Sequence, residues 1–261
     1  MRHLIMILLI IIIGATTSFA GECGDVDGTA GLNILDIVHL INYKYKDGPE
    51  PDCGMVTDID GNVYQTVTIG AQEWMTENLK VMHYRNGDPI PNITDNAEWL
   101  GLSTGAYCNF DNDEHNVATY GRFYNWYAVD DSRNIAPEGW HVPTDEEWKQ
   151  LEMYLGMSQA DADAVLWRGA EGGKLKETGT THWWSPNDDA TNESGFTALP
   201  AGIRDNNNGT FYRMGNYAHI WSSSEYNSIG AWNRALRYTD SAIHRNYPNK
   251  QGGYSVRCVK N

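Results

Sequence analysis

The sequence predicts an α+β protein: a domain with short strands, two helices and long loops, preceded by a small calcium-binding loop with one helix. Three observations support this class. From residue 55 onward, short apolar segments alternate with Gly, Asn and Asp, as strands joined by turns do. A capping motif marks one helix within this domain. Near the N-terminus, oxygen-bearing side chains with the spacing of a calcium loop precede an apolar helical pattern.

The first 20 residues have the pattern of a secretory signal. Arg2 precedes an unbroken apolar run over residues 4–13, and Ser18 and Ala20 place small side chains where signal peptidase cleaves. The apolar run is too short to span a bilayer comfortably. We therefore expect residues 1–20 to be removed and the protein to be exported, with membrane attachment only if the signal is retained.

Export would expose the four cysteines to an oxidising compartment. They are Cys23, Cys53, Cys108 and Cys258, and four cysteines allow three pairings that sequence alone does not distinguish. We favour Cys23–Cys53 and Cys108–Cys258, because each pair brackets one module. No Cys or His group has the spacing of a zinc site.

An acidic segment after the signal has the spacing of a calcium loop. Oxygen-bearing side chains occupy positions 1, 3, 5, 9 and 12 of a twelve-residue loop, and position 7 offers a backbone carbonyl. These residues are Asp25, Asp27, Thr29, Asn33 and Asp36, with Gly31 at position 7. Ala30 replaces the usual turn glycine and Thr29 replaces a stronger ligand, so both should weaken calcium binding. The alternative is a solvated acidic turn.

Residues 21–54 resemble one dockerin type I repeat, the half-EF-hand unit of secreted bacterial proteins. The resemblance implies bound calcium and docking to a cohesin-like partner, although a full dockerin uses two such repeats and only one is found. The segment 58–62 is similar to the start of a second loop. A strand-like run with Tyr64, Val67 and Ile69 follows it, however, so we predict a hairpin turn at residues 60–62.

Local signals place the helices of the larger domain, residues 55–261. Thr144 followed by Glu147 forms a capping box, Trp148 and Leu151 begin an apolar stripe, and Gly156 ends the helix. A second, shorter helix is expected after residue 158.

The segment 254–259 alternates like a half-buried strand, with Tyr254, Val256 and Cys258 on one face.

Several motifs of this domain, in the same order, resemble the Fibrobacter succinogenes major paralogous domain family. They lie at residues 58–64, 74–79, 120–126, 139–144 and 255–258. The resemblance covers nearly all of residues 55–261. It implies a C-type-lectin-like fold and display outside a bacterial cell, but it assigns no activity.

Two classes of protein with related folds have functional sites whose key residues this sequence lacks. Residues 142–148 resemble the helix-opening motif of formylglycine-generating enzymes, which hold copper with two closely spaced cysteines near the C-terminus. Only Cys258 lies there, and Cys108 is far upstream. C-type lectins bind sugar through calcium held partly by a Trp-Asn-Asp triplet. The nearest match, Trp232-Asn233-Arg234, replaces a ligand with a cation.

Trp183 and Trp184 are the candidate ligand contacts. Adjacent residues of an extended segment point to opposite faces, so one of these rings should face solvent. Their neighbours are mainly polar, which is typical of a surface loop. The alternative is that both rings fill the core, because the chain has ten Trp and only five Phe.

Together these features predict a secreted or cell-surface binding protein without catalytic activity, which recognises polysaccharide, an envelope component or a protein partner. The formal net charge of −15 disfavours binding to nucleic acid. The alternative is an enzyme, either a formylglycine-type oxidase or a glycan hydrolase. Acidic residues are abundant, but nothing marks two of them as a catalytic pair.

Overall fold

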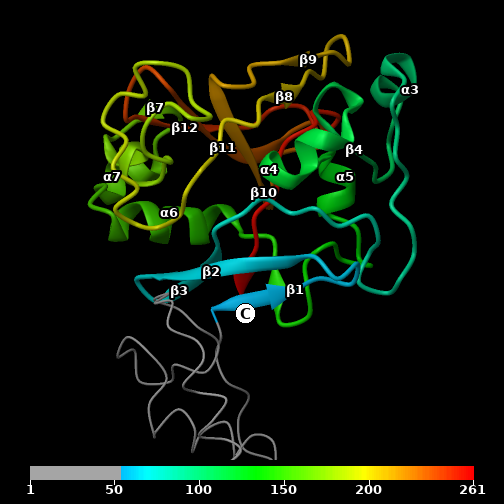
Figure 1. The fold of residues 1–261 in the computed structure, drawn as a ribbon, viewed down its shortest axis with the longest axis horizontal. Helices are drawn as coiled ribbons and strands as arrows, with labels where there is room; N and C mark the ends of the chain where they lie inside the picture. The colour runs from blue at the N-terminus through cyan, green and yellow to red at the C-terminus, as the bar shows by residue number, and fades with distance from the viewer. Residues whose placement is uncertain (1–53) are drawn as a thin grey trace, which may run out of the picture. The chain divides into compact units, whose positions relative to one another are not determined.

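The computed structural model describes residues 54–261, of which Val56–Asn261 form one compact unit (Figure 1). The predicted signal segment, the calcium loop with its helix, and both Cys23 and Cys53 lie outside the described residues. The described part contains helices and mainly antiparallel strands, which confirms the α+β class. Within it, no helix is long and apolar enough to cross a membrane.

A five-stranded sheet occupies the lower part of Figure 1, with the strand order β1-β2-β3-β13-β6. Its strands are β1 (Met55–Thr57), β2 (Val63–Ile69), β3 (Gln72–Met75), β13 (Val259–Lys260) and β6 (Trp140–His141). The turn predicted at residues 60–62 joins β1 to β2. The Asp58 carboxylate holds it by accepting hydrogen bonds from the backbone N–H groups of Asp60 and Asn62, both at 2.9 Å.

A four-stranded antiparallel sheet has the order β10-β11-β12-β7. Its strands are β10 (Tyr217–Glu225), β11 (Ala231–Arg237), β12 (Ile243–Asn246) and β7 (Leu166–Arg168). Two short ribbons complete the strands: β4 (Tyr107–Cys108) with β5 (Phe123–Tyr124), and β8 (Ile203–Arg204) with β9 (Phe211–Tyr212).

Both predicted helices are present, as α6 (Asp145–Tyr154) and α7 (Gln159–Asp163). The capping box of α6 forms as expected: Thr144 Oγ1 accepts from the Glu147 backbone N–H, and the Glu147 carboxylate accepts from that of Thr144. The prediction of two helices was nevertheless wrong. Three further short helices are α3 (Asn96–Leu100), α4 (Val117–Tyr120) and α5 (Trp126–Val129). The 3₁₀ turns are η1 (Phe110–Asn112), η2 (Glu114–Asn116) and η3 (Glu171–Lys174).

Helix α6 lies between the two sheets (Figure 1). Its buried face, with Trp148 and Leu151, shares one hydrophobic cluster with Trp74 of β3 and Ile220 of β10. The Trp74 and Trp148 rings lie 4.9 Å apart, centroid to centroid. The helix therefore connects the sheets through a common core, and burial of these large side chains supplies much of the driving force for packing.

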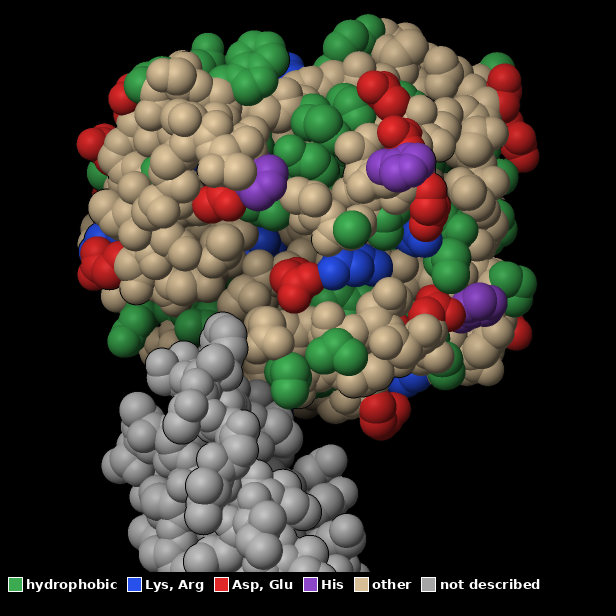
Figure 2. Space-filling model, viewed as in Figure 1, with side chains coloured by type: hydrophobic (Ala, Val, Ile, Leu, Met, Phe, Trp, Pro, Cys, Tyr) green, Lys and Arg blue, Asp and Glu red, His purple; other side chains and the backbone are tan. Residues whose placement is uncertain are grey.

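Charged side chains on the surface occur largely in pairs of opposite sign. Figure 2 shows a face on which each histidine lies beside an acidic side chain. Four pairs of this kind occur within residues 54–261: His83–Asp60, His115–Asp113, His141–Glu147 and His182–Glu177, with N···O distances of 2.5, 2.7, 2.8 and 2.8 Å. Within residues 54–261, no three His, Cys, Asp or Glu side chains converge as a metal site would require.

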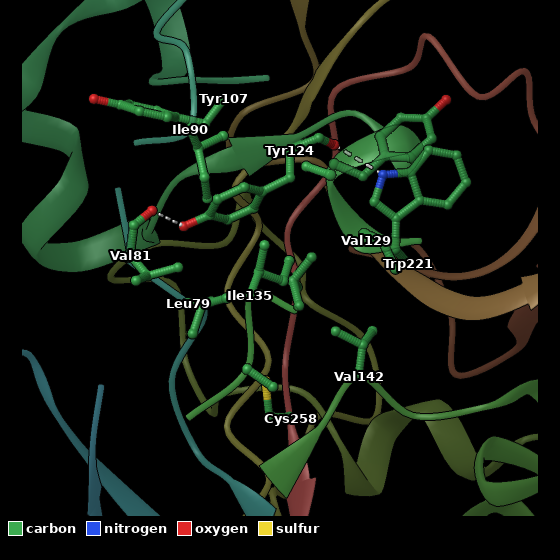
Figure 3. Close-up of a cluster of buried hydrophobic side chains, with 14 of the residues drawn as sticks. Leu79, Val81, Ile90, Tyr107, Tyr124, Val129, Ile135, Val142, Trp221 and Cys258 are labelled. Atoms are coloured by element: carbon green, nitrogen blue, oxygen red, sulfur yellow. Dashed lines mark hydrogen bonds between the residues drawn. The ribbon is translucent and has the colours of Figure 1, made fainter. Parts of the chain in front are cut away.

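A second core lies around Tyr124 (Figure 3). The Tyr124 hydroxyl donates to the Val81 carbonyl at 2.7 Å, and the Trp221 indole N–H donates to the Tyr124 carbonyl at 2.9 Å. These bonds satisfy polar atoms that are otherwise surrounded by apolar side chains such as Leu79 and Ile135.

The C-terminal segment is buried on both sides rather than on one. Tyr254, Val256 and Cys258 are buried as predicted, but Ser255 and Arg257 are equally buried, each 1% exposed. The Arg257 guanidinium is accommodated because it donates to the carbonyls of residues 196 and 197 and to the Asn78 amide oxygen. An alternating pattern does not reveal such burial, because a buried arginine looks like a surface residue in sequence.

Five charged side chains are buried between α6 and the four-stranded sheet. Asp145 binds Arg234 at 2.8 Å and Arg245 at 2.6 Å, while Glu152 binds Arg234 and Arg168, both at 2.6 Å. Three positive charges thus face two negative ones in the protein interior, a cluster that we call the buried ion cluster. Its pairing offsets a desolvation penalty that would be prohibitive for isolated charges.

Candidate ligand-binding surface

The two predicted tryptophans lie on opposite sides of their segment. Trp183 is 1% exposed, and its indole N–H donates to the Ala198 carbonyl at 3.0 Å, so it is a core residue that a ligand does not reach. Trp184 is 56% exposed. Its ring covers Gly215, where a Cβ atom would come within 2.3 Å of the indole nitrogen. Trp184 therefore remains a candidate contact, and Trp183 does not.

The favoured Cys108–Cys258 disulfide is not formed, and both thiols are free and buried. Cys108 packs with Trp99 and Phe123, whereas Cys258 lies in the cluster around Tyr124. A disulfide requires Cβ atoms about 3.8 Å apart, which separate clusters do not allow. Burial raises the pKa of Cys108 to about 12 and raises that of Cys258 as well, so neither thiol is poised as a nucleophile or copper ligand.

A lysine of unusual pKa also has a structural explanation. Burial lowers the pKa of Lys176 to about 8, which is the kind of shift found in nucleophilic amines. Its ammonium group donates to the backbone carbonyls of Asp188, Arg237 and Asp240 at 2.8 to 3.1 Å. All three N–H donors are therefore engaged, and the side chain is buried. Lys176 acts as a fixed cation that ties its own segment to the loop at residue 188 and to the turn that follows β11.

A group of two exposed tyrosines and one half-buried tryptophan at one end of the four-stranded sheet was not predicted. The rings of Tyr226 and Tyr247 stack with centroids 3.8 Å apart and an interplanar angle of 19°. Trp232 meets both edge-on, at 4.9 and 5.4 Å. Tyr226 is 44% exposed and Tyr247 is 40% exposed. We call these three residues the aromatic platform.

The strand pairing and the buried charges hold the platform in place. Tyr226 follows β10, Trp232 lies in β11 and Tyr247 follows β12, so three neighbouring strands supply one ring each. The Arg245 guanidinium lies 3.7 Å from the Trp232 ring centroid and is itself fixed by Asp145.

A glycine in the β10–β11 loop allows the two platform loops to pack closely. A Cβ atom on Gly230 would come within 2.7 Å of the Tyr247 carbonyl oxygen. The rings are therefore preorganised, and a ligand would not have to order them.

The Trp232-Asn233-Arg234 triplet has roles unrelated to a lectin calcium site. Trp232 belongs to the platform, whereas Asn233 and Arg234 are 1% and 2% exposed. Arg234 stands at the position where a lectin would have aspartate, and here it is the centre of the buried ion cluster. The available signal for the platform was the pair Tyr226 and Trp232, which flank the turn-forming residues 227–230. Tyr247 carried no such signal.

A family model described as the Fibrobacter succinogenes major domain matches residues 67–260. No curated protein and no solved structure matches the chain.

Proposed function

Because the chain belongs to the Fibrobacter succinogenes major domain family, and because it exposes a preorganised aromatic platform, we propose that it is a non-catalytic binding protein of the bacterial exterior that recognises polysaccharide. The observation that carries this proposal is the cluster of the exposed Tyr226 and Tyr247 with the half-buried Trp232. Clustered exposed aromatics are uncommon on proteins that bind nothing.

Aromatic platforms suit sugars for a physical reason. The face of an aromatic ring carries partial negative charge, and the C–H groups on one side of a pyranose ring carry partial positive charge. Stacking also removes apolar area of both partners from water. Tyr hydroxyls remain available to hydrogen-bond the sugar hydroxyls at the rim.

Other parts of the proposal rest on the sequence. We propose a C-type-lectin-like fold for the domain, export directed by residues 1–20, and a dockerin-like calcium unit in residues 21–54. In that unit, residues Asp25 to Asp36 would hold calcium and the helix would meet a cohesin-like or other secreted partner. A chelator should then lower the melting temperature of the full chain, and Asp27→Asn should remove that response. An unchanged melting temperature at saturating chelator would rule out a stabilising calcium ion.

The platform is tested by depletion of the full-length protein onto insoluble cellulose, xylan and chitin. Loss of a central aromatic contact should weaken binding to the recognised polymer about tenfold. Tyr226→Ala and Tyr247→Ala should both show this loss. Tyr212→Ala is the matched control, because Tyr212 is similarly exposed at 46% but belongs to β9 and lies outside the platform.

The outcomes separate three cases. Binding that Tyr226→Ala weakens and Tyr212→Ala leaves unchanged supports the platform. Binding that only Trp184→Ala removes moves the site to the other exposed ring. No binding to any polymer by the wild-type protein refutes polysaccharide recognition and directs attention to protein partners.

A further inference from the structure

One side of the four-stranded sheet carries polar side chains that the platform does not use. Register pairs His219 of β10 with Ala235 of β11, Ala235 with His244 of β12, and His244 with Trp167 of β7. Directly paired residues project from the same side of a sheet. The small Ala235 side chain therefore lies between two imidazoles, and we call this side the histidine face.

Two buried polar atoms on the histidine face have no hydrogen-bond partner within residues 54–261. Asn233 Nδ2 lies 3.3 Å from His219 Nδ1, which leaves His219 Nε2 and Asn233 Oδ1 unpaired. His219 is 8% exposed and Asn233 is 1% exposed. Because an amide N–H only donates, Nδ1 accepts and Nε2 carries the hydrogen of the neutral ring. The face thus offers one unused donor and one unused acceptor, an arrangement that folded proteins rarely keep without a use.

The charge around this face is positive although the whole chain is strongly acidic. The exposed Arg213 guanidinium lies 4.8 Å from the Tyr217 ring centroid, and it has no ion-pair partner within residues 54–261. Burial lowers the pKa of His219 to about 3, and the nearby Arg213 adds to this effect. Burial, together with Arg237 and other arginines, lowers the pKa of His244 to about 4. Both imidazoles therefore stay neutral, in surroundings where an anion would be stabilised.

We propose that the histidine face is a second subsite, specific for the hexuronate units of an acidic glycan. The carboxylate of a hexuronate can bind the Arg213 guanidinium through two parallel hydrogen bonds. Its hydroxyl groups can accept a hydrogen bond from His219 Nε2 and donate one to Asn233 Oδ1. Both unpaired atoms are buried, and the His219 ring contacts the rings of Tyr217 and Tyr254, with centroids 5.7 and 5.3 Å away. In the proposed complex the half-exposed Tyr217 moves aside to admit the sugar. This inference deepens the proposed function, since it adds selectivity for charge to glycan recognition.

The two sites lie at opposite ends of β10. Tyr217 pairs with Arg237 at the end near the histidine face, whereas Glu225 pairs with Ala231 at the platform end. A strand of nine residues spans about 26 Å at 3.3 Å per residue. Trp232 and Ala235 are an odd number of positions apart in β11, so the two sites also face opposite sides of the sheet, and a trisaccharide fits only one of them.

The test is calorimetric titration of the full-length protein with trigalacturonate and with its carboxyl-reduced, neutral counterpart. The wild-type protein should bind the acidic trisaccharide at least about tenfold more tightly than the neutral one, as expected for one charge-assisted bidentate contact. Arg213→Gln should remove most of that preference. Arg213→Lys should leave part of it, because lysine keeps the positive charge but cannot form the bidentate contact.

Arg133→Gln is the matched control, because Arg133 also stacks on a tyrosine, Tyr84, at 4.0 Å but lies far from this sheet in sequence. It should leave the affinity unchanged within twofold. Equal affinity of the wild-type protein for both trisaccharides, or an equal loss in Arg133→Gln, overturns the proposal. If the wild-type protein shows no preference for the acidic trisaccharide but still binds polymer through Tyr226, the histidine-face proposal is wrong and the proposed role of the platform is unaffected. Tight binding of polyglutamate in place of trigalacturonate overturns the assignment to a sugar.

Discussion

Glu152 provides the sharpest test of how the domain is held together. Its carboxylate is fully buried and binds Arg234 and Arg168, both at 2.6 Å. Glu152→Gln keeps the shape of the side chain but leaves three buried guanidinium groups facing only Asp145. For Arg168, the only other hydrogen-bond acceptor within residues 54–261 is the Ile243 carbonyl at 3.2 Å. Removing one partner of a buried pair typically costs about 3–5 kcal/mol. We expect the lower end, about 3 kcal/mol, because the amide oxygen still accepts one hydrogen bond.

The assay is urea unfolding followed by tryptophan fluorescence. With a urea dependence of about 2 kcal/mol per molar, the unfolding midpoint should fall by roughly 1.5 M. Glu146→Gln is the control on the same helix, since Glu146 is 62% exposed and pairs with Lys149 at 3.1 Å. It should change stability by less than about 0.5 kcal/mol. Adding Arg168→Met to Glu152→Gln should restore part of the loss, because it removes an unpaired buried cation.

The reasoning fails if Glu152→Gln costs less than about 1 kcal/mol, or no more than Glu146→Gln. Either result would mean that water reaches the cluster in the folded protein, since only water could replace the lost acceptor at so little cost.

Three further predictions follow from single side chains. The hydrogen bond to Glu147 raises the pKa of His141, while bonds from His141 and Thr144 outweigh burial and lower that of Glu147. Their stabilisation is therefore complete between the ordinary values of 4.5 and 6.5 and declines outside that window. His141→Gln should thus destabilise the protein more at about pH 5.5 than at about pH 9, and an equal loss at both would contradict this. Thr144→Ala should cost about 1 kcal/mol by removing the cap of α6; an unchanged urea midpoint would show that the cap is dispensable. Cys108 and Cys258 should resist a thiol reagent in the native protein and react in urea, as measured by mass; native labelling of either would show that its cluster opens.

The sequence predicted those elements whose signals are local. The capping box at Thr144 and the turn at residues 60–62 are decided by side chains within four residues of the backbone they bind, so both formed as expected. The helices α3, α4 and α5 have four or five residues, too few to show an apolar repeat. Tertiary contacts stabilise them, as when the Trp126 indole N–H donates to the Ser222 carbonyl across the core.

Binding features were harder to predict because they depend on contacts distant in sequence. Tyr247 joins Tyr226 only through the register of three strands, and nothing near Tyr247 in the sequence indicates that neighbour. The prediction of a Cys108–Cys258 disulfide was wrong for a related reason: two cysteines that bracket a module in sequence need not lie together in the fold. Trp183 and Trp184 were correctly expected to diverge, but the sequence did not indicate which ring would be buried.

The position of β13 has a consequence for how the protein is made. Val259 pairs with Trp74 on one side and His141 on the other, so β3 and β6 are joined only through a segment that follows them by more than a hundred residues. The five-stranded sheet therefore stays open during synthesis until residue 259 has left the ribosome. Contacts so distant in sequence also form slowly. The five-stranded sheet is therefore complete only when nearly the whole domain has been translated, so β13 is the element that closes it.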